Sequence, residues 1–354
     1  MLTKRTIPTP ALLLDLDAFE ANLAVMSRQV RESGKQLRPH AKAHKCVEIA
    51  RRQLAAGACG VCVATLPEAE LMSQAGIEGL LLTSPVAAPC KIARIVDTGA
   101  MVVVDHPQQA VWYQQAAQAA NCPVDVLVDL DVGDHRTGAR SLDEALAIAH
   151  CVERASHLHM RGVQAYSVNG SHAGGPDKTE RARVSQEAFR AAAAVAEAMK
   201  KSAIAVEIVS GGSTGTWDID TSIADVTELQ AGSYVLMDLA YGKLNLPFRH
   251  ALTVATTVVS ANHDAFVTVD GGFKAFATDR GYGPEAIGFS GSGYRWGGDE
   301  FGYLDVGDCA IKPRLGDRVE FIPPHCDPTV NLHSKIYACR GENVEAVWAV
   351  MGRP

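Results

Sequence analysis

Short apolar segments rich in β-branched residues alternate along the chain with longer segments whose apolar residues recur every three or four positions. Continuous apolar runs suit strands buried on both faces, and the longer period is that of amphipathic helices, such as those expected over 17–34 and 181–201. The eight strand-like runs are 38–42, 60–65, 79–84, 101–105, 125–132, 161–167, 205–212 and 225–235. Eight strand–helix repeats predict an α/β fold of the (β/α)8 TIM-barrel type.

The pattern changes after Pro247. Stretches such as "ALTVATTVV", "GDRVEFIPP" and "VNLHSKIYACR" predict strands and turns without long helices. We therefore expect a barrel over residues 12–247 and an antiparallel β domain over 248–354, with residues 1–11 joining the β domain. A length of 354 residues suits one large barrel plus a smaller domain.

Composition and charge narrow the classes of function. Hydrophobic residues make up 47% of the chain and charged residues 21%, and 33 basic against 40 acidic residues give a net charge of −7. Such a chain has no basic field for nucleic acid or an anionic membrane. No apolar run approaches the roughly 20 residues of a membrane span, and residues 1–10 lack the apolar core of a secretion signal. We expect a cytoplasmic protein that acts on a small molecule.

The nine cysteines are odd in number and scattered, which predicts reduced thiols. Cys59-Gly-Val-Cys62 matches the C-x-x-C pattern, but it lies in a strand-like run and lacks the second pair that a zinc site would need. We expect core residues there.

Barrel enzymes carry their active sites at the carboxyl ends of the strands, so the residues that end each run deserve inspection. The first run, "RPHAK", ends on Lys42, which would point its amine into the barrel mouth. A solvated lysine just past a strand would also fit. A lysine held among neighbouring groups can instead form a Schiff base with a carbonyl, as in pyridoxal phosphate enzymes.

Three further segments at the predicted strand ends carry suitable chemistry. "DLDVGDHRTGAR" places Arg136 where it can meet a phenolate or carboxylate, although a surface arginine is the alternative. "SGGSTGT" (210–216) and "QAGSY" (230–234) follow the seventh and eighth strands, where barrels often bind phosphate through backbone amides. Neither is a Walker loop, and both could be plain turns.

Together these segments resemble the alanine racemase-like, fold type III class of pyridoxal phosphate enzymes, and within it the D-threonine aldolase and D-serine dehydratase branch. The resemblance runs from "TPALLLDLDAFEANL" through "RPHAKAHK" to "HCDPTVNLH". It implies that Lys42 is the Schiff-base lysine, that Arg136 lies near the phenolic oxygen of the cofactor, and that Tyr166 is the tyrosine of the mouth. The implied phosphate-binding positions are Gly211, Gly212, Ser213, Gly232, Ser233 and Tyr234.

Gln230 departs from the wider class, because alanine racemases have an arginine two positions before the strand-eight glycine. A neutral partner at the pyridine nitrogen would leave the ring a weaker electron sink than a carboxylate partner would. We therefore expect the enzyme to need help elsewhere, for instance from a metal.

"PPHCDPTV" places His325 and Asp327 two positions apart, which in extended backbone sends both side chains to one face. One imidazole and one carboxylate suit a divalent ion such as Mn²⁺, with Mg²⁺ as an alternative, better than zinc. An ordinary loop is the other interpretation. In the resemblance, the dehydratases carry cysteine at the second ligand position, where Asp327 matches the aldolases. Cys326 beside it keeps the dehydratase interpretation open.

Two histidines accompany these groups. His172, in the loop after the sixth strand, matches a histidine of the aldolases proposed as the acid or base, and an imidazole titrates near neutrality. A loop histidine without a role is the alternative. By strand alternation His40 shares a face with Lys42 and would support the cofactor ring.

The resemblance implies a metal-activated, pyridoxal phosphate-dependent D-threonine aldolase that cleaves D-β-hydroxy-α-amino acids to glycine and an aldehyde. The alternative is a D-serine or D-threo-3-hydroxyaspartate dehydratase that forms a 2-oxo acid and ammonia. A racemase is less favoured because its second catalytic tyrosine cannot be placed in the β domain. A non-catalytic cofactor carrier should lack both the second domain and the His-x-Asp pair. Relatives form dimers, which predicts a homodimer. Residues 294–305 would be a contact between subunits, a loop over the site or an ordinary surface loop.

Overall fold

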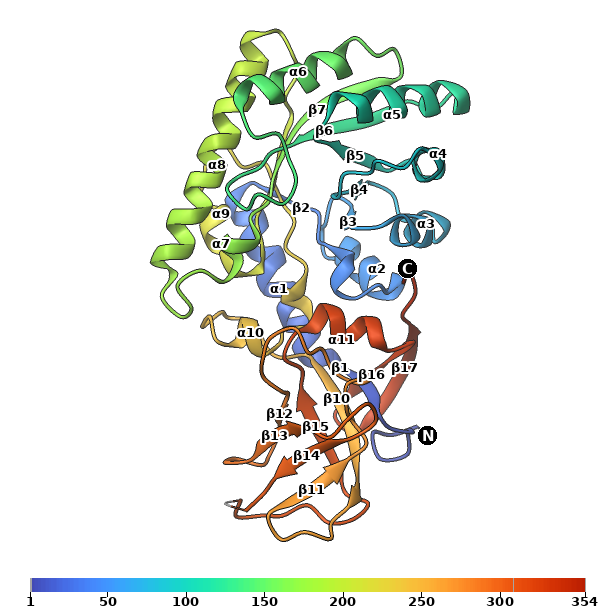
Figure 1. The fold of residues 1–354 in the computed structure, drawn as a ribbon, viewed down its shortest axis with the longest axis vertical. Coiled ribbons are helices and arrows are strands. Elements are labelled where there is room, and N and C mark those ends of the chain that lie inside the picture. The colour runs from blue at the N-terminus through green and yellow to red at the C-terminus, as the bar shows by residue number, and fades with distance from the viewer. Residues whose placement is uncertain (1, 308, 354) are drawn as a thin grey trace. The chain divides into compact units, whose positions relative to one another are not determined.

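The computed structural model describes residues 2–307 and 309–353, which form two compact units. One unit contains residues 26–42, 47–232 and 352–353, and the other contains 2–25, 43–46 and 233–351, leaving out 308. Both can be followed by residue colour in Figure 1. The domain boundary between residues 247 and 248 stays a prediction.

The first unit is built on eight parallel strands, as the sequence pattern predicted. The sheet runs in the order β2-β9-β8-β7-β6-β5-β4-β3. A parallel bridge between His40 and Cys62 joins its first and last strands, so the sheet curls into the expected barrel. The strands are β2 (Gln36–Leu37), β3 (Val61–Val63), β4 (Leu80–Leu82), β5 (Met101–Val104), β6 (Val124–Asp129), β7 (Leu158–Ala165), β8 (Ile208–Gly211) and β9 (Glu228–Leu229).

Helices follow the strands along the chain, and the two that the sequence pattern singled out form as α1 and α8. Local capping explains where they begin: the Ser141 side chain accepts a hydrogen bond from the Glu144 amide at the start of α6. The helices up to β9 are α1 (Leu16–Ser33), α2 (Val47–Ala55), α3 (Leu66–Gln74), α4 (Pro89–Asp97), α5 (Pro107–Ala120), α6 (Leu142–Glu153), α7 (Val168–His172), α8 (Lys178–Lys201) and α9 (Trp217–Asp220).

Adjacent barrel strands share a continuous apolar core. Cys62, Leu81, Val103 and Leu127 come from β3 to β6, pack into one cluster and are at most 1% exposed. Every residue of β3 and β4 is buried, as expected for strands covered on both faces. The strand ends are consequently held in fixed positions.

The prediction that Lys42 closes the first barrel strand is wrong in detail. Strand β2 ends at Leu37, and Lys42 lies on a 3₁₀ turn, Ala41–Ala43. Pro39 has no amide hydrogen to continue the ladder, and pairing beyond it consists of the His40 bridge to Cys62 and a 3.4 Å hydrogen bond from the His40 amide to the Ala231 carbonyl. The lysine is therefore carried by a turn that follows the strand end.

The second unit is a nine-stranded sheet whose path runs β13-β14-β11-β10-β1-β16-β17, with β15 pairing β10 and β12. All pairs are antiparallel except that of β1 with β16. The strands are β1 (Ala11–Asp15), β10 (Leu252–Ser260), β11 (Phe266–Val269), β12 (Glu285–Ala286), β13 (Gly293–Trp296), β14 (Gly302–Asp305), β15 (Arg318–Ile322), β16 (Lys335–Arg340) and β17 (Asn343–Ala349). Two short helices, α10 (Leu239–Gly242) and α11 (Cys326–Leu332), interrupt the strands.

Helix α11 corrects the expectation of extended backbone through His325 and Asp327. His325 is extended and precedes the helix, whereas Asp327 lies in its first turn. Residues 330–332, which begin the stretch "VNLHSKIYACR" predicted to form strand and turn, also belong to this helix. Pro328 is tolerated there because first-turn amides need no helical partner. The Cys326 amide, which has no partner within the helix, donates to Asp238 Oδ2 at 2.8 Å.

None of the helices in the described parts of the chain combines the length and apolar character that a membrane span requires. All nine cysteines are reduced thiols, as predicted, but Cys59 is exposed and is not the core residue expected there, whereas Cys62 is buried.

Candidate functional site

Lys42 is held by contacts from its own turn. The His40 ring lies between the Lys42 amide, 3.3 Å from Nδ1, and Thr83 Oγ1, 3.0 Å from Nε2. Because Thr83 donates its hydroxyl hydrogen to the Val63 carbonyl, His40 Nε2 is the donor to Thr83. His40 thus links the lysine turn to the end of β4, consistent with the supporting role predicted for it.

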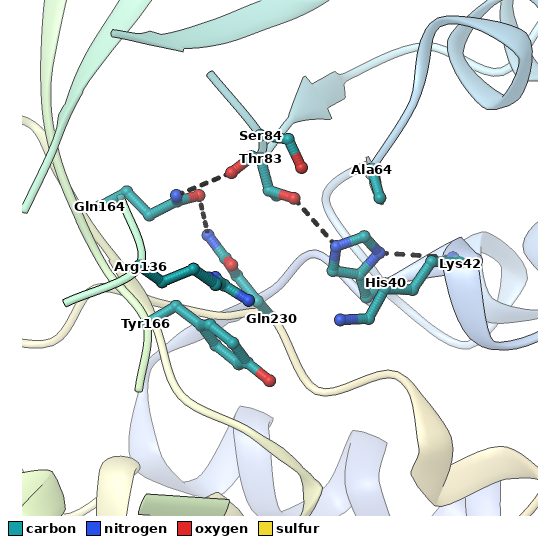
Figure 2. Close-up of a pocket in the computed structure, with 9 residues that line it drawn as sticks. All are labelled: His40, Lys42, Ala64, Thr83, Ser84, Arg136, Gln164, Tyr166 and Gln230. Carbon is teal, nitrogen blue, oxygen red and sulfur yellow. Dashed lines mark hydrogen bonds between the residues drawn. The ribbon is translucent and has the colours of Figure 1, made fainter. Parts of the chain in front are cut away.

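A pocket opens beside this turn and brings together five of the residues singled out in the sequence (Figure 2). They are His40, Lys42, Arg136, Tyr166 and Gln230. The other lining residues are Ala64, Thr83, Ser84 and Gln164. All nine follow strand ends or close strands of the same barrel.

The Tyr166 ring lies close to both cations of the pocket. Lys42 Nζ is 5.4 Å from the ring centroid and Arg136 Cζ is 5.3 Å from it. At these distances the ring face attracts either positive charge. Tyr166 therefore restrains the lysine and the arginine that the resemblance pairs with the cofactor.

Buried polar side chains form the floor of the pocket. Gln230 Nε2 donates to Gln164 Oε1 at 3.1 Å and to Ser210 Oγ at 3.0 Å. Gln164 in turn donates to Asp129 Oδ1 at 2.8 Å. Burial raises the pKa of Asp129 to about 6, although hydrogen bonds from Gln164 and Thr137 oppose the shift.

The turn after β8 is supported by a carboxylate that the sequence reading missed. Asp220 Oδ2 lies 3.3 Å from the Ser213 amide, and its carboxylate also accepts from the Thr216 and Ser185 hydroxyls. Gly212 has φ +77°, and a Cβ there would lie 2.3 Å from Asp220 Oδ2. Glycine is thus required at this position by the left-handed backbone conformation and by the lack of room for a side chain beside Asp220.

The same turn also contains a hydroxyl suited to a ligand. Thr214 Oγ1 is buried and finds no hydrogen-bond partner among the described residues. A buried donor without a partner is costly, and a phosphate oxygen would satisfy it. This observation fits the phosphate cup predicted over 210–216.

Gly232, in the second predicted phosphate loop, allows a close backbone approach. A Cβ at this position would lie 2.6 Å from the His40 carbonyl oxygen. Ser233 and Tyr234 follow on a 3₁₀ turn, Ser233–Val235, and both are buried. Tyr234 packs on Phe248 with ring centroids 5.7 Å apart.

His172 is not among the residues that line the pocket. It ends helix α7, whose start is held by Ser167 and by Asp134. Asp134 accepts from Ser167 Oγ at 3.0 Å and from the Val168 and Asn169 amides. The loop that carries Arg136 is therefore tied to the helix that carries His172.

His325 and Asp327 lie in the second unit. His325 Nδ1 is 2.7 Å from Asp279 Oδ2, which orients the imidazole so that its other nitrogen, Nε2, points away from Asp279. Asp327 Oδ1 is 3.3 Å from Ser233 Oγ and 3.2 Å from Cys326 Sγ. Within 2–307 and 309–353, no three His, Cys, Asp or Glu side chains converge on a common metal position.

Sequence reasoning missed Thr83, Ser84, Ala64 and Gln164 as pocket residues. Gln164 and Asp129 were visible as polar residues inside otherwise apolar strand segments, and both proved buried. Ala64, Thr83 and Ser84 end ordinary strand runs, and the sequence offers no comparable signal for them.

Comparison with known proteins agrees with this architecture. The family model of the alanine racemase N-terminal domain matches residues 14–239, and a serine dehydratase domain matches 251–339. The chain therefore belongs to the alanine racemase-like, fold type III family of pyridoxal phosphate enzymes, on the branch of D-threonine aldolases and hydroxyaspartate dehydratases.

Individual relatives match over nearly the whole chain. A D-threonine aldolase from Arthrobacter sp. is 38% identical over 98% of this chain and 93% of its own length. The crystal structure of D-threonine aldolase from Filomicrobium marinum superposes with a TM-score of 0.95 at 34% identity, covering 99% of this chain and 96% of that one. D-threo-3-hydroxyaspartate dehydratase from Delftia sp. HT23 gives a TM-score of 0.89 at 26% identity, covering 99% of both chains. A variant of such a dehydratase has been solved in a metal-free form.

Asp220 makes stability depend on pH. Burial raises its pKa from 3.8 to about 7, against hydrogen bonds from Ser185, Thr216 and Ser213. The stabilising contribution of the raised pKa is complete below pH 3.8 and is lost as pH rises through 7. At about 1.4 kcal/mol per pKa unit, the unfolding free energy of the wild type should therefore fall by about 4 kcal/mol relative to that of Asp220→Asn as the pH rises.

Urea unfolding of the cofactor-free protein from pH 4 to pH 8 measures this difference, with exposed Asp97→Asn as control. A pH-independent difference between wild type and Asp220→Asn would contradict the assignment.

Proposed function

We propose that the protein is a metal-activated, pyridoxal phosphate-dependent aldolase that cleaves D-β-hydroxy-α-amino acids such as D-threonine to glycine and an aldehyde. The observation that carries this proposal is the pocket in which the Lys42 amine, Arg136 and Tyr166 meet, in a chain of this family. The cofactor supplies an electron sink that weakens the bonds at the amino acid Cα.

Each pocket residue has a distinct part. Lys42 would hold the cofactor through its aldehyde carbon, at the place where the amine of the substrate would bind. The fixed charge of Arg136 balances the phenolic oxygen, and Tyr166 keeps both cations in place. The phosphate-binding positions are Gly211, Gly212, Ser213, Gly232, Ser233 and Tyr234, and the unsatisfied Thr214 hydroxyl supports that assignment.

His172 is proposed as the base that removes the hydroxyl proton of the substrate. Removal of that proton allows the hydroxyl carbon to become a carbonyl as the Cα–Cβ bond breaks. The Asp134 cap of α7 gives His172 a defined position relative to the Arg136 loop. The pocket lining does not include His172, so its role depends on the resemblance.

His325 and Asp327 are proposed to hold a divalent ion, with Mn²⁺ preferred over Mg²⁺. The Asp279 carboxylate on His325 Nδ1 is the arrangement that orients an imidazole to present Nε2 to a metal. One imidazole and one carboxylate leave most coordination positions to water and substrate, as hard divalent ions accept. A bound ion would supply a Lewis acid that lowers the pKa of a hydroxyl group.

A dehydratase that forms a 2-oxo acid and ammonia is the second candidate. The serine dehydratase domain over 251–339 and the similarity to the Delftia enzyme favour it. Asp327 favours the aldolase, because the resemblance places a cysteine at that position in dehydratases. Cys326 is fully buried, and burial raises its thiol pKa well above the ordinary value, which disfavours it as a thiolate ligand.

Lys42→Ala should abolish covalent cofactor attachment. Wild-type protein supplied with pyridoxal phosphate should show a lysine-bound absorbance band, and borohydride reduction should leave a pyridoxyl group on the peptide that contains Lys42. Lys91→Ala, an exposed lysine on α4, is the matched control and should label like wild type. A label on another lysine, or a persisting band in Lys42→Ala, would refute the anchor.

D-Threonine separates the two lyase candidates. The aldolase should release acetaldehyde and glycine in equal amounts, because only the Cα–Cβ bond breaks. The dehydratase should release 2-oxobutyrate and ammonia instead. Quantifying all four products after incubation with the loaded enzyme decides between them, and finding only the oxo acid would sink the aldolase proposal.

The metal site is tested by Mn²⁺ binding and by turnover. His325→Ala and Asp327→Ala should lose Mn²⁺ binding measured by calorimetry, and Asp279→Asn should weaken it by about 10–100-fold through the orientation of His325. His263→Ala, an exposed loop histidine, is the control and should bind like wild type. Full turnover in excess chelator, or unchanged binding in His325→Ala, would contradict a catalytic metal.

A further inference from the structure

The direction of the Gln230 amide is fixed from one side by a backbone carbonyl. Gln164 Nε2 lies 3.0 Å from the Thr83 carbonyl oxygen and 2.8 Å from Asp129 Oδ1. A carbonyl oxygen can only accept, so this end of the Gln164 amide is the nitrogen and the other end is the oxygen. The atom of Gln230 that lies 3.1 Å from Gln164 Oε1 must consequently be the donor, Nε2.

An ion pair fixes the amide from the other side. Glu228 Oε2 lies 2.7 Å from Arg38 Nη2, and both side chains are nearly fully buried. The paired carboxylate only accepts, so the Ser210 hydroxyl hydrogen points to Glu228 Oε1 at 2.8 Å. Ser210 Oγ is then left to accept from Gln230 Nε2 at 3.0 Å.

Both hydrogens of the Gln230 amide are therefore used within the barrel, and its oxygen remains. The Gln230 side chain is 4% exposed and lines the pocket, with its nitrogen directed at Gln164 (Figure 2). Across the described residues, no hydrogen bond reaches Gln230 Oε1. Rotating the amide would bring two oxygens together at Gln164 and would give up both bonds of Nε2.

We propose that Gln230 is a hydrogen-bond acceptor in the pocket and keeps the ring nitrogen of bound pyridoxal phosphate protonated. This inference rests on the proposed function and on the assignment of Gln230 to the ring nitrogen. It adds to the sequence-based expectation, which compared a neutral partner only with a carboxylate partner, that this neutral partner favours the protonated ring.

The chemistry of the ring nitrogen decides the pairing. An unprotonated nitrogen offers only a lone pair, which would face the lone pairs of Gln230 Oε1 in a buried place. A protonated nitrogen carries one hydrogen, which Oε1 accepts, and a hydrogen bond to the charged form favours that form. A protonated ring withdraws electrons more strongly from the amino acid. An arginine at this position could only donate, and it would favour the unprotonated ring.

The charged groups around the amide are consistent with a ring cation. Asp129 is connected to Gln230 by hydrogen bonds through Gln164, and Glu228 is connected to it through Ser210. The charge of Glu228 is balanced by its ion pair with Arg38. The fixed charge of Arg136 lies 5.3 Å from the centroid of the Tyr166 ring.

Nitrogen-15 NMR of enzyme loaded with ring-¹⁵N pyridoxal phosphate tests the proposal. Wild type and Gln230→Glu should show the shift of a protonated ring nitrogen at pH 7.5, and Gln230→Arg should show that of an unprotonated one. Borohydride labelling of Lys42 in the same samples separates the two possible failures. A labelled wild type with an unprotonated ring would overturn the role of Gln230 alone. A wild type without label would overturn the proposed function and this inference with it.

A cofactor analogue keeps the test independent of how Gln230→Arg folds. Replacing the ring nitrogen by carbon removes the donor, so the analogue should bind wild type about tenfold or more weakly than pyridoxal phosphate, as expected for loss of a hydrogen bond to a charged group. Gln230→Leu, which has no acceptor, is the matched variant and should bind the two nearly equally. An equal preference in wild type and Gln230→Leu would refute the proposal.

Discussion

The buried ion pair between Arg38 and Glu228 is the constraint on which the pocket floor depends. It joins the residue that follows β2 to strand β9, and Arg38 also donates to the Gly79 carbonyl ahead of β4. Burial alone would lower the pKa of Arg38, but the hydrogen bond and charge of Glu228 raise it, so Arg38 stays protonated. Removing one partner of such a pair typically costs about 3–5 kcal/mol because the other charge is left buried. The hydrogen bonds that run through Ser210 to the amide at residue 230 all begin at this carboxylate.

Two buried carboxylates support different parts of the carboxyl end of the barrel strands. Asp129 supports the pocket through Gln164 and Thr137, whereas Asp220 supports the turn after β8. Both have raised pKa values because burial outweighs the hydrogen bonds they accept. The barrel is therefore less stable above neutral pH, where these two buried carboxyl groups are ionised, and in return they hold polar groups at the strand ends. That arrangement is typical of sites where geometry matters more than stability.

The strand–helix alternation and seven of the eight predicted strand runs were confirmed because they depend on the period of apolar residues, a local property, whereas the first strand, Gln36–Leu37, ends before the predicted run 38–42 begins. Lys42, Arg136, Tyr166 and Gln230 were expected at the mouth from their places after strand runs, and they share one pocket. The extended backbone assumed for residues 325–327 was wrong because the partner of the Cys326 amide, Asp238, is 88 residues away in sequence. Gln164 was missed for a similar reason, since its partners Thr83 and Asp129 belong to other strands and turns, whereas two partners of Asp220, Ser213 and Thr216, lie within seven residues of it.

The sequence by itself determined the barrel, the second β-rich unit and the types of residue at the strand ends, because apolar spacing and turn chemistry act over a few residues. Only the tertiary structure decided which atom of each polar side chain faces the pocket. Gln230 and Gln164 are 66 residues apart, and Arg38 and Glu228 are 190 apart. A hydrogen bond depends on direction as well as on composition, and its direction follows from partners that only the folded barrel brings together.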